Sequence, residues 1–387
     1  MIFEDHRGSL HSLKNLSFRP KEILVSQNSK NVFRGFHMSP YAKFIYVTRG
    51  AIRDFYWSNG TLTEKWLGRG DSLYIPAGAA HGFRSIEDSE VIYLLEEEFD
   101  PQKDRNIYWQ TPEFSIPRFD EAILSQKDRD AKYYDTYDYI VLGASGFLGQ
   151  QCVKYLRLAG KKVLESSARL EKPSEILEQI QKSGARYVIC AAGISGRPTI
   201  DWCETHEDET YNINYLAVLN LMEVCKDVHL TIFGSGAVYT GTKALYTEDD
   251  PPDFDSKVYS KYRIMLEKML KPNVLYLRIM YPCTFDGHPK CFYQKMLGRK
   301  GSVHAARVSI TSVPDMFPHI STLAESGSTG IYNFVADGAV SLTELVNDPS
   351  PNSEPPRGNY ELSSQKLGLR IPLIKIKSAL ERRCASL

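Results

Sequence analysis

The chain has 387 residues, of which 42% are hydrophobic and 24% are charged, proportions typical of a soluble globular protein with two domains. Lysine plus arginine number 47, as do aspartate plus glutamate, so the formal net charge is zero. We therefore expect no nucleic-acid partner, because no global basic field exists to attract one, and the chain has no acidic tail.

The start of the chain and its cysteines bear on the compartment. Residues 1–6 are charged early and lead into no apolar core, so we expect no signal peptide. No run reaches the ~18 apolar residues that a membrane helix needs, so we expect no membrane association. The seven cysteines are scattered along the chain and odd in number, and they form no Cys-x-x-Cys pair. This pattern favours a reduced, cytoplasmic compartment over a disulfide framework.

The first 110 residues are predicted to form many short strands. Segments rich in β-branched and aromatic residues alternate with turn signals such as Asn59-Gly60 and Gly68–Asp71. The segments are 23–25, 43–47, 52–57, 72–75 and 90–94. Strands of this length and spacing are typical of a sandwich or barrel. Residues 111–136 are polar and contain prolines, and we predict that they close this domain and run into a linker.

From Tyr137 onward, strands alternate with helices. We predict strands at 139–142, 162–164, 187–191 and 229–233, and helices at 150–158, 174–182 and 209–225. This alternation indicates a doubly wound parallel sheet. Residues 348–358, rich in proline, serine and asparagine, are predicted to form a loop. The chain is therefore divided into two predicted domains, residues 1–132 and residues 133–387.

The first domain carries residue types suited to proton transfer. Moving a proton on a carbon next to a carbonyl requires a base, an acid on the opposite face, and a cation or donor for the enolate oxygen. His37, Lys43, His81 and Tyr93 are suited to these tasks, and Arg34 is suited to bind a phosphate or carboxylate.

The motifs around these residues resemble the nucleotide-sugar 3,5-epimerases of the rhamnose pathway, which are cupin jelly rolls. They occur in that family's order: Asp5–Gly8, Arg34–His37, Pro40–Lys43, Ile75–Phe83, Ile92-Tyr93 and Ile123–Asp128. The resemblance covers about residues 4–130. It implies an all-β cupin fold for the first domain.

The resemblance also implies roles for individual residues. His37 would be the base, and Asp128 would pair with it and orient it. Lys43 would stabilise the enolate oxygen, and Tyr93 would return a proton on the other face.

The substrate side of this site departs from the family in two ways. Arg34 would bind a diphosphate oxygen and His81 would line the sugar pocket. However, the segment from His37 to Lys43 is four residues shorter than usual, which admits a different nucleotide or sugar. Phe99 falls where the family often has a second tyrosine, which would restrict the reaction to one carbon. The two histidines are also possible metal ligands, but the usual metal-cupin spacing is absent, so we expect no metal.

The second domain opens with a nucleotide-binding turn after its first strand. Gly143 permits the tight turn, Gly146 lets the backbone approach a pyrophosphate, and Gly149 lets the helix pack on the strand. This form resembles the extended short-chain dehydrogenase/reductases, which implies a Rossmann-type fold. The implied cofactor contacts are Gly143, Ser145, Gly146, Phe147, Leu148, Gly149, Ala191, Ala192 and Gly193.

Reductases of this family use a serine or threonine, a tyrosine and a lysine. Ser235 at the end of a strand and Tyr259 in a later helix match the first two. Arg263 occupies the position of the lysine, and it keeps the positive charge without the compact ammonium geometry. Lys257 and Lys261 are alternative cations, but neither is in register.

A closer resemblance covers residues 138–375. Residues 191–204, Asn214, Arg278 and residues 357–362 resemble the plant-type 3,5-epimerase/4-reductases that make UDP-rhamnose. It implies that Arg197 and Arg278 contact the substrate. Those plant proteins carry out both reactions in one reductase-type domain, whereas here a cupin precedes it, so we expect this domain to supply mostly reduction.

The cofactor type depends on the end of the second strand. No clear acidic residue follows it, Glu165 being a weak candidate for the ribose. Arg169 is suited to meet a 2′-phosphate, so we favour NADPH, with NADH as the alternative.

Together these features predict a bifunctional enzyme. It would epimerise a UDP- or dTDP-4-keto-6-deoxy-hexose at C3, C5 or both, and then reduce the C4 ketone to give an L-rhamnose-like nucleotide sugar. A homodimer is expected from the resemblance alone.

Four alternatives stay open at this point. The protein would be a reductase only, with the cupin as a dimerisation or binding module; a 3-epimerase/4-reductase acting on a 2-acetamido sugar; a non-catalytic nucleotide-sugar sensor, consistent with Arg263; or a 3,4-ketoisomerase. The run Ala80–Phe83 argues against the last of these.

Overall fold

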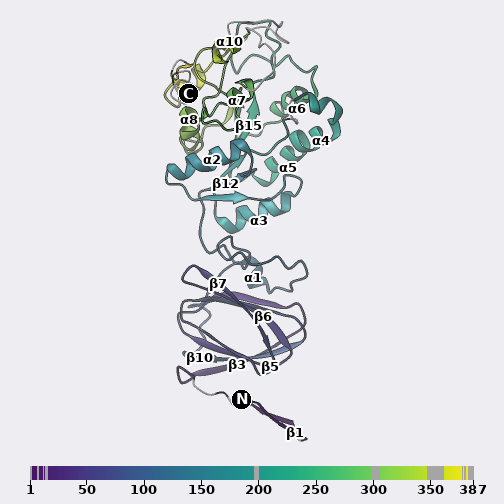
Figure 1. Cartoon of the computed structure of the whole chain (residues 1–387), viewed down its shortest axis with the longest axis vertical. Coiled ribbons are helices and arrows are strands. Elements are labelled where there is room, and N and C mark those ends of the chain that lie inside the picture. The colour runs from purple at the N-terminus through teal and green to yellow at the C-terminus, as the bar shows by residue number, and fades with distance from the viewer. Residues whose placement is uncertain are drawn as a thin grey trace. The chain divides into compact units, whose positions relative to one another are not determined.

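A computed structural model describes residues 2–376 except 7, 12, 14, 15, 196–199, 298–305 and 347–360, together with residues 378 and 381. The chain divides into two compact units, Met1–Thr136 and Tyr137–Leu387 (Figure 1). The boundary follows residue 136 rather than the predicted residue 132. The reason is that Tyr133 is buried and the Tyr134 N–H donates to the Thr111 hydroxyl, so both residues belong to the first unit.

The first unit consists of antiparallel sheets, as predicted. One sheet has the order β3-β10-β5-β8 and the other β11-β4-β9-β6-β7. The strands of the first sheet are β3 (Glu22–Asn28), β10 (Ser89–Leu95), β5 (Lys43–Arg49) and β8 (Ser72–Ile75). Those of the second are β11 (Arg105–Asn106), β4 (Phe33–Met38), β9 (Ala80–Ser85), β6 (Ala51–Ser58) and β7 (Thr61–Gly68). A separate hairpin pairs β1 (Ile2–Asp5) with β2 (Gly8–His11).

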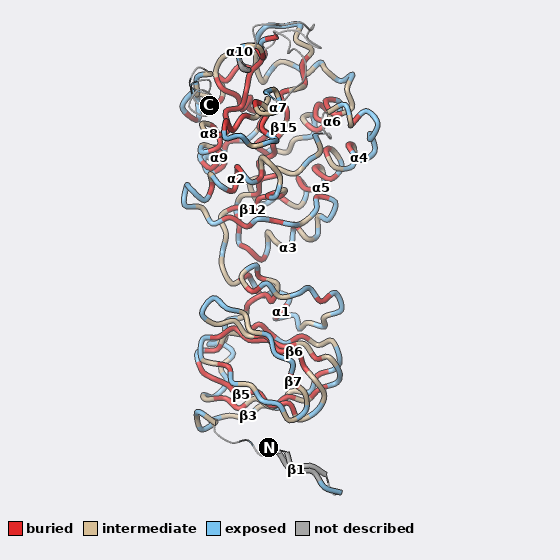
Figure 2. Tube along the Cα trace, in the orientation of Figure 1, coloured by how far each residue is buried: buried red, intermediate tan, exposed pale blue. Residues whose placement is uncertain are grey.

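A shared core joins the two larger sheets. Ile45 and Val91 come from one sheet, and Ile52 and Phe83 come from the other, and all four are fully buried in one cluster. Buried residues recur along the strands of both sheets, as the red segments of Figure 2 show. The predicted strands were found, but β4, β7, β9, the short β11 and the hairpin β1–β2 were not predicted.

The segment after β11 packs against the strands of the first unit through buried aromatic side chains. Trp109, Phe114 and Phe119 are buried, with ring centroids 4.9 Å apart for Phe33–Trp109 and for Phe36–Phe114. The segment also contains α1 (Gln126–Asp130). Residues 111–136 were predicted to close the first domain. They do so by aromatic packing, which their polar composition did not indicate.

The second unit contains a six-stranded parallel sheet of order β13-β12-β14-β15-β17-β19. Its strands are β12 (Tyr139–Leu142), β13 (Val163–Ser166), β14 (Tyr187–Cys190), β15 (His229–Ser235), β17 (Val274–Ile279) and β19 (Gly330–Phe334). The strand order reverses between β12 and β14, the switch point at which doubly wound sheets bind ligands. The predicted Rossmann-type fold is confirmed.

Helices surround this sheet. They include α2 (Phe147–Leu158), α3 (Pro173–Ser183), α4 (Glu207–Tyr211), α5 (Ala217–Val224), α6 (Val258–Glu267) and α9 (Ile320–Glu325). The predicted helix 209–225 is interrupted by a π-helical turn, Asn212–Leu216, between α4 and α5. Every residue of β12 and β17 is buried, because helices cover both faces of a parallel sheet.

Smaller elements complete the unit. The strands are β16 (Leu245–Tyr246), β18 (Arg307–Val308), β20 (Val340–Ser341) and β21 (Glu361–Leu362). The helices are α7 (Phe292–Leu297), α8 (Val313–Met316), α10 (Leu342–Val346) and α11 (Gln365–Gly368), with 3-10 turns at Ile200–Thr205 and Phe317–His319. None of the helices described is long and apolar enough to cross a bilayer.

Candidate active sites

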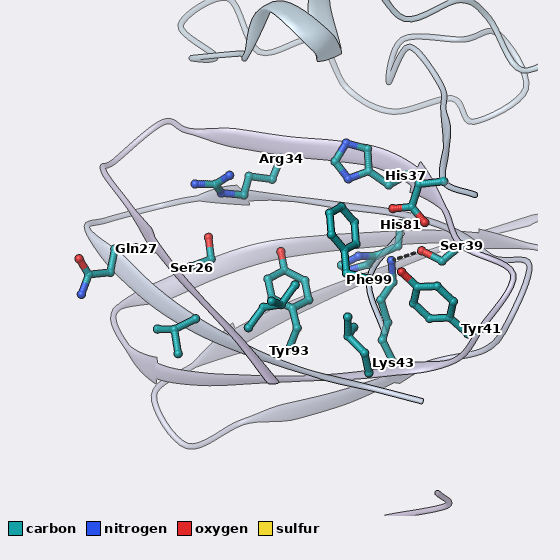
Figure 3. A pocket seen from close by; sticks show the side chains of 14 residues that line it. Ser26, Gln27, Arg34, His37, Ser39, Tyr41, Lys43, His81, Tyr93 and Phe99 are labelled. Atoms are coloured by element: carbon teal, nitrogen blue, oxygen red, sulfur yellow. Dashed lines mark hydrogen bonds between the residues drawn. The ribbon is translucent and has the colours of Figure 1, made fainter. Parts of the chain in front are cut away.

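The first unit encloses a cavity of about 380 Å³. Arg34, His37, Lys43, His81 and Tyr93 all line it, and their side chains are drawn around it in Figure 3. The structure therefore brings together five residues that are spread over 60 positions of the sequence. The sixth predicted residue of this site, Asp128, lies behind His37.

A bulge between β4 and β9 explains how Arg34 and His37 reach the same cavity. Side chains alternate along a strand, so residues three positions apart normally point to opposite faces. Here the register shifts between Arg34 and His37, so that Gly35 and Phe36 on β4 stand opposite the single residue Gly82. Gly35 has φ of +111°, and a Cβ on it would lie 2.6 Å from the His81 carbonyl oxygen. Only glycine tolerates both the positive φ and this close approach. The motif Arg34–His37 therefore forms a bulge that directs the side chains of Arg34 and His37 into the same cavity.

His37 is held by a buried carboxylate. Its Nε2 lies 3.1 Å from Asp128 Oδ1, with the Asp128 side chain 7% exposed. Ser125 caps α1. Its hydroxyl oxygen accepts a hydrogen bond from the Asp128 N–H, and its hydroxyl donates one to Asp128 Oδ2 at 2.7 Å. Burial acts to raise the pKa of Asp128, but the hydrogen bonds from His37 and Ser125 outweigh it and lower the pKa. With Asp128 ionised and accepting from Nε2–H, the other ring nitrogen of His37 is left with a lone pair for a proton.

His81 forms a second histidine–carboxylate pair that the sequence analysis missed. Its Nε2 lies 2.8 Å from Asp54 Oδ2, and both side chains are almost fully buried. Burial lowers the pKa of His81, and the charge of Asp54 opposes this shift. The signal for Asp54 was a carboxylate in the middle of the predicted strand 52–57, next to an aromatic run.

Lys43 supplies a buried positive charge. It is 6% exposed, and its Nζ donates to the Ser39 hydroxyl at 3.3 Å (Figure 3). Burial lowers the pKa of Lys43, while the carboxylates of Asp104 and Asp54 oppose that effect. Asp104 and Ser39 both line the cavity, and neither was predicted.

Tyr93 and Phe99 complete the cavity wall. Burial raises the pKa of Tyr93, and the nearby charge of Arg34 only partly opposes it, so the phenol stays protonated. Phe99 lines the same cavity and is 43% exposed. A histidine with a carboxylate, a buried ammonium and a neutral phenol around one cavity is an arrangement able to remove and return a proton on a carbon acid. Among the described residues, no cluster of three or more candidate metal-ligating side chains was found.

The second unit has a backbone cradle after β12. Gly143 has φ of +73°, and a Cβ on it would lie 2.7 Å from the backbone of Ala192. A Cβ on Gly149 would lie 2.1 Å from the Gly143 carbonyl oxygen, and Gly146 is the N-cap of α2. The helix N-terminus therefore opens onto a turn in which glycines bring the backbone close together, which fits the pyrophosphate of a dinucleotide.

The other predicted cofactor contacts lie around this cradle. Ser145, Phe147 and Leu148 belong to the turn and to the first turn of α2, and residues 191–193 follow β14, which pairs with β12. Arg169 is exposed three residues after the end of β13. Glu165 is ion-paired with Arg157 at 2.7 Å.

The predicted reductase residues come from the end of β15 and from α6. Ser235 ends β15, and Tyr259 lies in the first turn of α6. The Ser260 hydroxyl donates to the Ala237 carbonyl at 2.7 Å, which ties the helix start to the segment after β15. The Arg263 guanidinium carbon lies 5.3 Å from the centre of the Tyr259 ring. The positive charge beside Tyr259 is therefore supplied by Arg263.

The alternative lysines point elsewhere. Lys261 pairs with Glu207 at 3.0 Å, and Lys257 lies 3.5 Å from Asp201. Both ion pairs are solvent-exposed. Neither lysine replaces Arg263 beside Tyr259.

Arg278 is part of a closed network rather than an open site. It is 1% exposed and donates to both carboxylate oxygens of Glu267, to the Tyr239 hydroxyl and to Asn333. With these donors engaged inside the protein, Arg278 has a structural role, and the prediction of substrate contact is corrected. The other predicted substrate arginine, Arg197, and residues 357–360 lie outside the described residues.

Comparisons with known proteins divide the chain in the same way. Residues 2–135 match the family described as dTDP-4-dehydrorhamnose 3,5-epimerase, and residues 139–273 match the NAD dependent epimerase/dehydratase family. A dTDP-4-dehydrorhamnose 3,5-epimerase of Pseudomonas aeruginosa is 31% identical over 29% of this chain and 71% of that protein.

A plant relative is similar over both units. It is the trifunctional UDP-glucose 4,6-dehydratase/UDP-4-keto-6-deoxy-D-glucose 3,5-epimerase/UDP-4-keto-L-rhamnose-reductase RHM1 of Arabidopsis thaliana, 25% identical over 97% of this chain. The chain spans 63% of the length of that protein. Among solved structures, the L780 UDP-rhamnose synthase of Acanthamoeba polyphaga mimivirus has a TM-score of 0.59 at 24% identity, covering 65% of this chain and all of that one. This likeness shows the fold.

The cavity with its paired histidines, the glycine cradle and these matches agree on an enzyme with a nicotinamide-binding second domain. The chain belongs, through its first unit, to the dTDP-4-dehydrorhamnose 3,5-epimerase family, and it joins that unit to a domain of the NAD dependent epimerase/dehydratase type.

Proposed function

We propose that this chain is a bifunctional enzyme that epimerises a nucleotide-linked 4-keto-6-deoxy-hexose and then reduces it to an L-rhamnose-like nucleotide sugar. The observation that carries the proposal is that one chain holds two groups of side chains suited to proton transfer. His37, Lys43 and Tyr93 line one cavity, with Asp128 bonded to His37, and Arg263 lies against both Tyr259 and Gly193, in the segment after β14. The names of the plant relative include both reactions.

The epimerisation follows from the geometry of the cavity. C3 and C5 both adjoin the C4 ketone, so their protons are acidic enough to remove once the forming enolate is stabilised. His37 takes the proton while Asp128 holds the ring and stabilises the imidazolium. The Lys43 ammonium offsets the negative charge on the enolate oxygen. Tyr93, kept neutral by burial, returns a proton from the other face and inverts the carbon.

The reduction uses the second site. A bound nicotinamide supplies the hydride to C4. Ser235 and Tyr259 hold the ketone oxygen, Tyr259 donates its proton to it, and the charge of Arg263 stabilises the tyrosinate that remains. We infer NADPH as the preferred cofactor because Arg169 follows the second strand of the fold, where a 2′-phosphate would bind, and because Glu165 is already paired with Arg157.

The substrate is inferred to be a UDP- or dTDP-sugar, with the diphosphate bound by Arg34. We also propose that the protein is a cytoplasmic homodimer. The edge strand β3 supports self-association, since Ile23 and Val25 are 61% and 60% exposed on it. The six described cysteines, all reduced and buried, agree with a reducing compartment.

Solvent exchange separates this proposal from its rivals. The chain is incubated in D₂O with the UDP- and dTDP-4-keto-6-deoxyglucose nucleotides in turn, without cofactor, and the sugar is analysed by NMR. Deuterium at C3 or C5 supports an active first domain and identifies the nucleotide. If neither sugar exchanges but NADPH is consumed when it is added afterwards, the first domain is a dimerisation or binding module. If only a 2-acetamido analogue exchanges, the substrate class changes.

A further inference from the structure

Arg263 is enclosed by groups from different elements. It is 5% exposed, and its Nη2 would lie 3.0 Å from a Cβ on Gly193, so the guanidinium rests directly on the backbone after β14. Its guanidinium carbon is 5.3 Å from the centre of the Tyr259 ring. The guanidinium is thus anchored on two sides.

Tyr276 lies in the same region. It is fully buried on β17 and shares the face of that strand with Arg278, whose partner Glu267 belongs to α6. A Cβ on Gly234 would lie 2.1 Å from the Tyr276 ring and 2.6 Å from its hydroxyl oxygen. The tip of the phenol therefore rests on Gly234, directly before Ser235, and it interacts electrostatically with Arg263 and Tyr259.

Each of these two side chains has a buried polar atom without a partner. Among the described residues, Arg263 Nε and Tyr276 Oη both lack a hydrogen bond. Native proteins leave few such atoms unsatisfied, and a buried one calls for an explanation. The two atoms are complementary, because Nε–H is a donor and the phenol oxygen accepts.

Other nearby groups are already engaged. Both carboxylate oxygens of Glu267 accept from Arg278. The Cys190 thiol, which also lies close to Arg263, donates to the Ala192 carbonyl. Neither group is therefore a ready partner for Nε–H.

We propose that Tyr276 is a positioning residue for the reduction: its hydroxyl accepts the Nε–H of Arg263, directly or through one buried water, and holds the guanidinium against Tyr259. The inference rests on the proposed reductase function and deepens it. A guanidinium is a rigid, planar fork with fixed donor directions, so it needs an anchor on each side to keep its orientation. A lysine ammonium at this position has freely rotating donors and no Nε–H. Tyr276 thus compensates for the arginine that replaces lysine in this chain.

A double-mutant cycle tests the pairing. The rate of NADPH-dependent reduction is measured for the wild type, Tyr276→Phe, Arg263→Lys and the double variant. We expect Tyr276→Phe to lower kcat about tenfold with the KM for the nucleotide sugar unchanged, and to change kcat less than about twofold in the Arg263→Lys background. An equal loss in both backgrounds, or no loss in the first, overturns the proposal.

The chain offers a matched control for stability. Tyr239→Phe removes the hydroxyl of another buried tyrosine that bonds a buried arginine, Arg278, outside the reacting groups. We expect a lower melting temperature with little change in kcat. Solvent exchange catalysed by the first domain reports in every variant whether that domain remains intact. If Tyr239→Phe lowers kcat as much as Tyr276→Phe does, the effect is structural and the proposal fails.

A second readout does not depend on turnover. With ¹⁵N-arginine labelling, the Arg263 Nε–H signal is identified as the one missing in Arg263→Lys. We expect its hydrogen exchange to be at least about tenfold faster in Tyr276→Phe, because a protected proton exchanges only when its hydrogen bond opens. Absence of NADPH turnover in the wild type would refute the reductase function, whereas unchanged Nε–H exchange would refute the contact.

Discussion

The two sites of this chain are built by different means. In the first unit, side chains from strands of both sheets converge on a cavity, and each histidine that lines it has its own carboxylate, Asp128 or Asp54. In the second, the cradle is made of backbone that glycines bring close together, and the reacting side chains stand at the ends of β15 and α6.

Both sites contain buried polar atoms without a hydrogen-bond partner among the described residues. They are Asp54 Oδ1 and Asp104 Oδ1 in the first site, and Arg263 Nε and Tyr276 Oη in the second. A site that must invert a carbon through an enolate needs its charges fixed in advance. The variants described below test this difference between the two sites, beginning with the largest expected effect.

Replacing the base should silence only the first site. His37→Asn removes the group that accepts the proton, and we expect deuterium incorporation at C3 or C5 to fall about 10³-fold, within the usual range for a general base. Reduction of a supplied 4-keto-L-rhamnose nucleotide should continue at the wild-type rate. Unchanged incorporation would remove His37 from the mechanism.

Replacing the acid of the second site should give the reverse pattern. Tyr259→Phe keeps the ring beside Arg263 but removes the proton donor, and we expect NADPH oxidation to fall about 10²-fold or more. Deuterium incorporation should stay at the wild-type level, measured in the same sample. Loss of both activities would mean that the two sites are not independent.

Adding one methyl group should test the close packing of the second site. Gly234→Ala places a Cβ 2.1 Å from the Tyr276 ring, so the phenol must move. We expect the unfolding free energy to drop by about 1–3 kcal/mol, as overpacking in a full core does, together with slower reduction. In Gly68→Ala, the nearest atom is 3.8 Å away, and this variant should be neutral in calorimetry. A neutral Gly234→Ala would show that Tyr276 is not confined.

Cofactor preference should depend on one exposed charge. Arg169→Ala removes the guanidinium after β13, and we expect the KM for NADPH to rise about tenfold, the usual cost of one charge-assisted hydrogen bond. The KM for NADH should not change, because NADH lacks the 2′-phosphate. Equal effects on both cofactors would assign Arg169 another role.

The pH profile of exchange should report the buried lysine. Because burial lowers the pKa of Lys43, its ammonium loses the proton below the ordinary lysine range, and exchange should decline as the pH rises through that point. Lys43→Arg keeps the charge at every accessible pH, so its profile should lose this decline even if the overall rate is lower. A decline that persists in Lys43→Arg belongs to another group.

The sequence predicted the two folds because their periodicities differ, short strands in one half and alternating strands and helices in the other. It did not predict β4 and β9, since the runs Arg34–His37 and Ala80–Phe83 combine glycine and charge, which strands seldom do. The bulge that aims Arg34 and His37 depends on pairing with a strand far away in the sequence. Local patterns do not encode such pairing.

Several site residues were beyond prediction for a similar reason. Asp54 acts through His81, which is distant in sequence. Tyr276 lies near Arg263 only because β17 packs beside β15, where Gly234 leaves room for the Tyr276 ring. Arg278 was misassigned because burial against Glu267 is decided by the packing of α6 on β17. A charged residue type indicates a role, but its partners decide whether that role is catalysis or structure.

The order of the two reactions is the central claim, and one NMR time course tests it most directly. The chain is incubated with UDP-4-keto-6-deoxyglucose in D₂O, and NADPH is added midway. We predict deuterium at C3 or C5 before the addition, followed by a deuterated L-configured 6-deoxy sugar as NADPH is consumed. A reduced D-sugar without deuterium at either carbon would contradict the account.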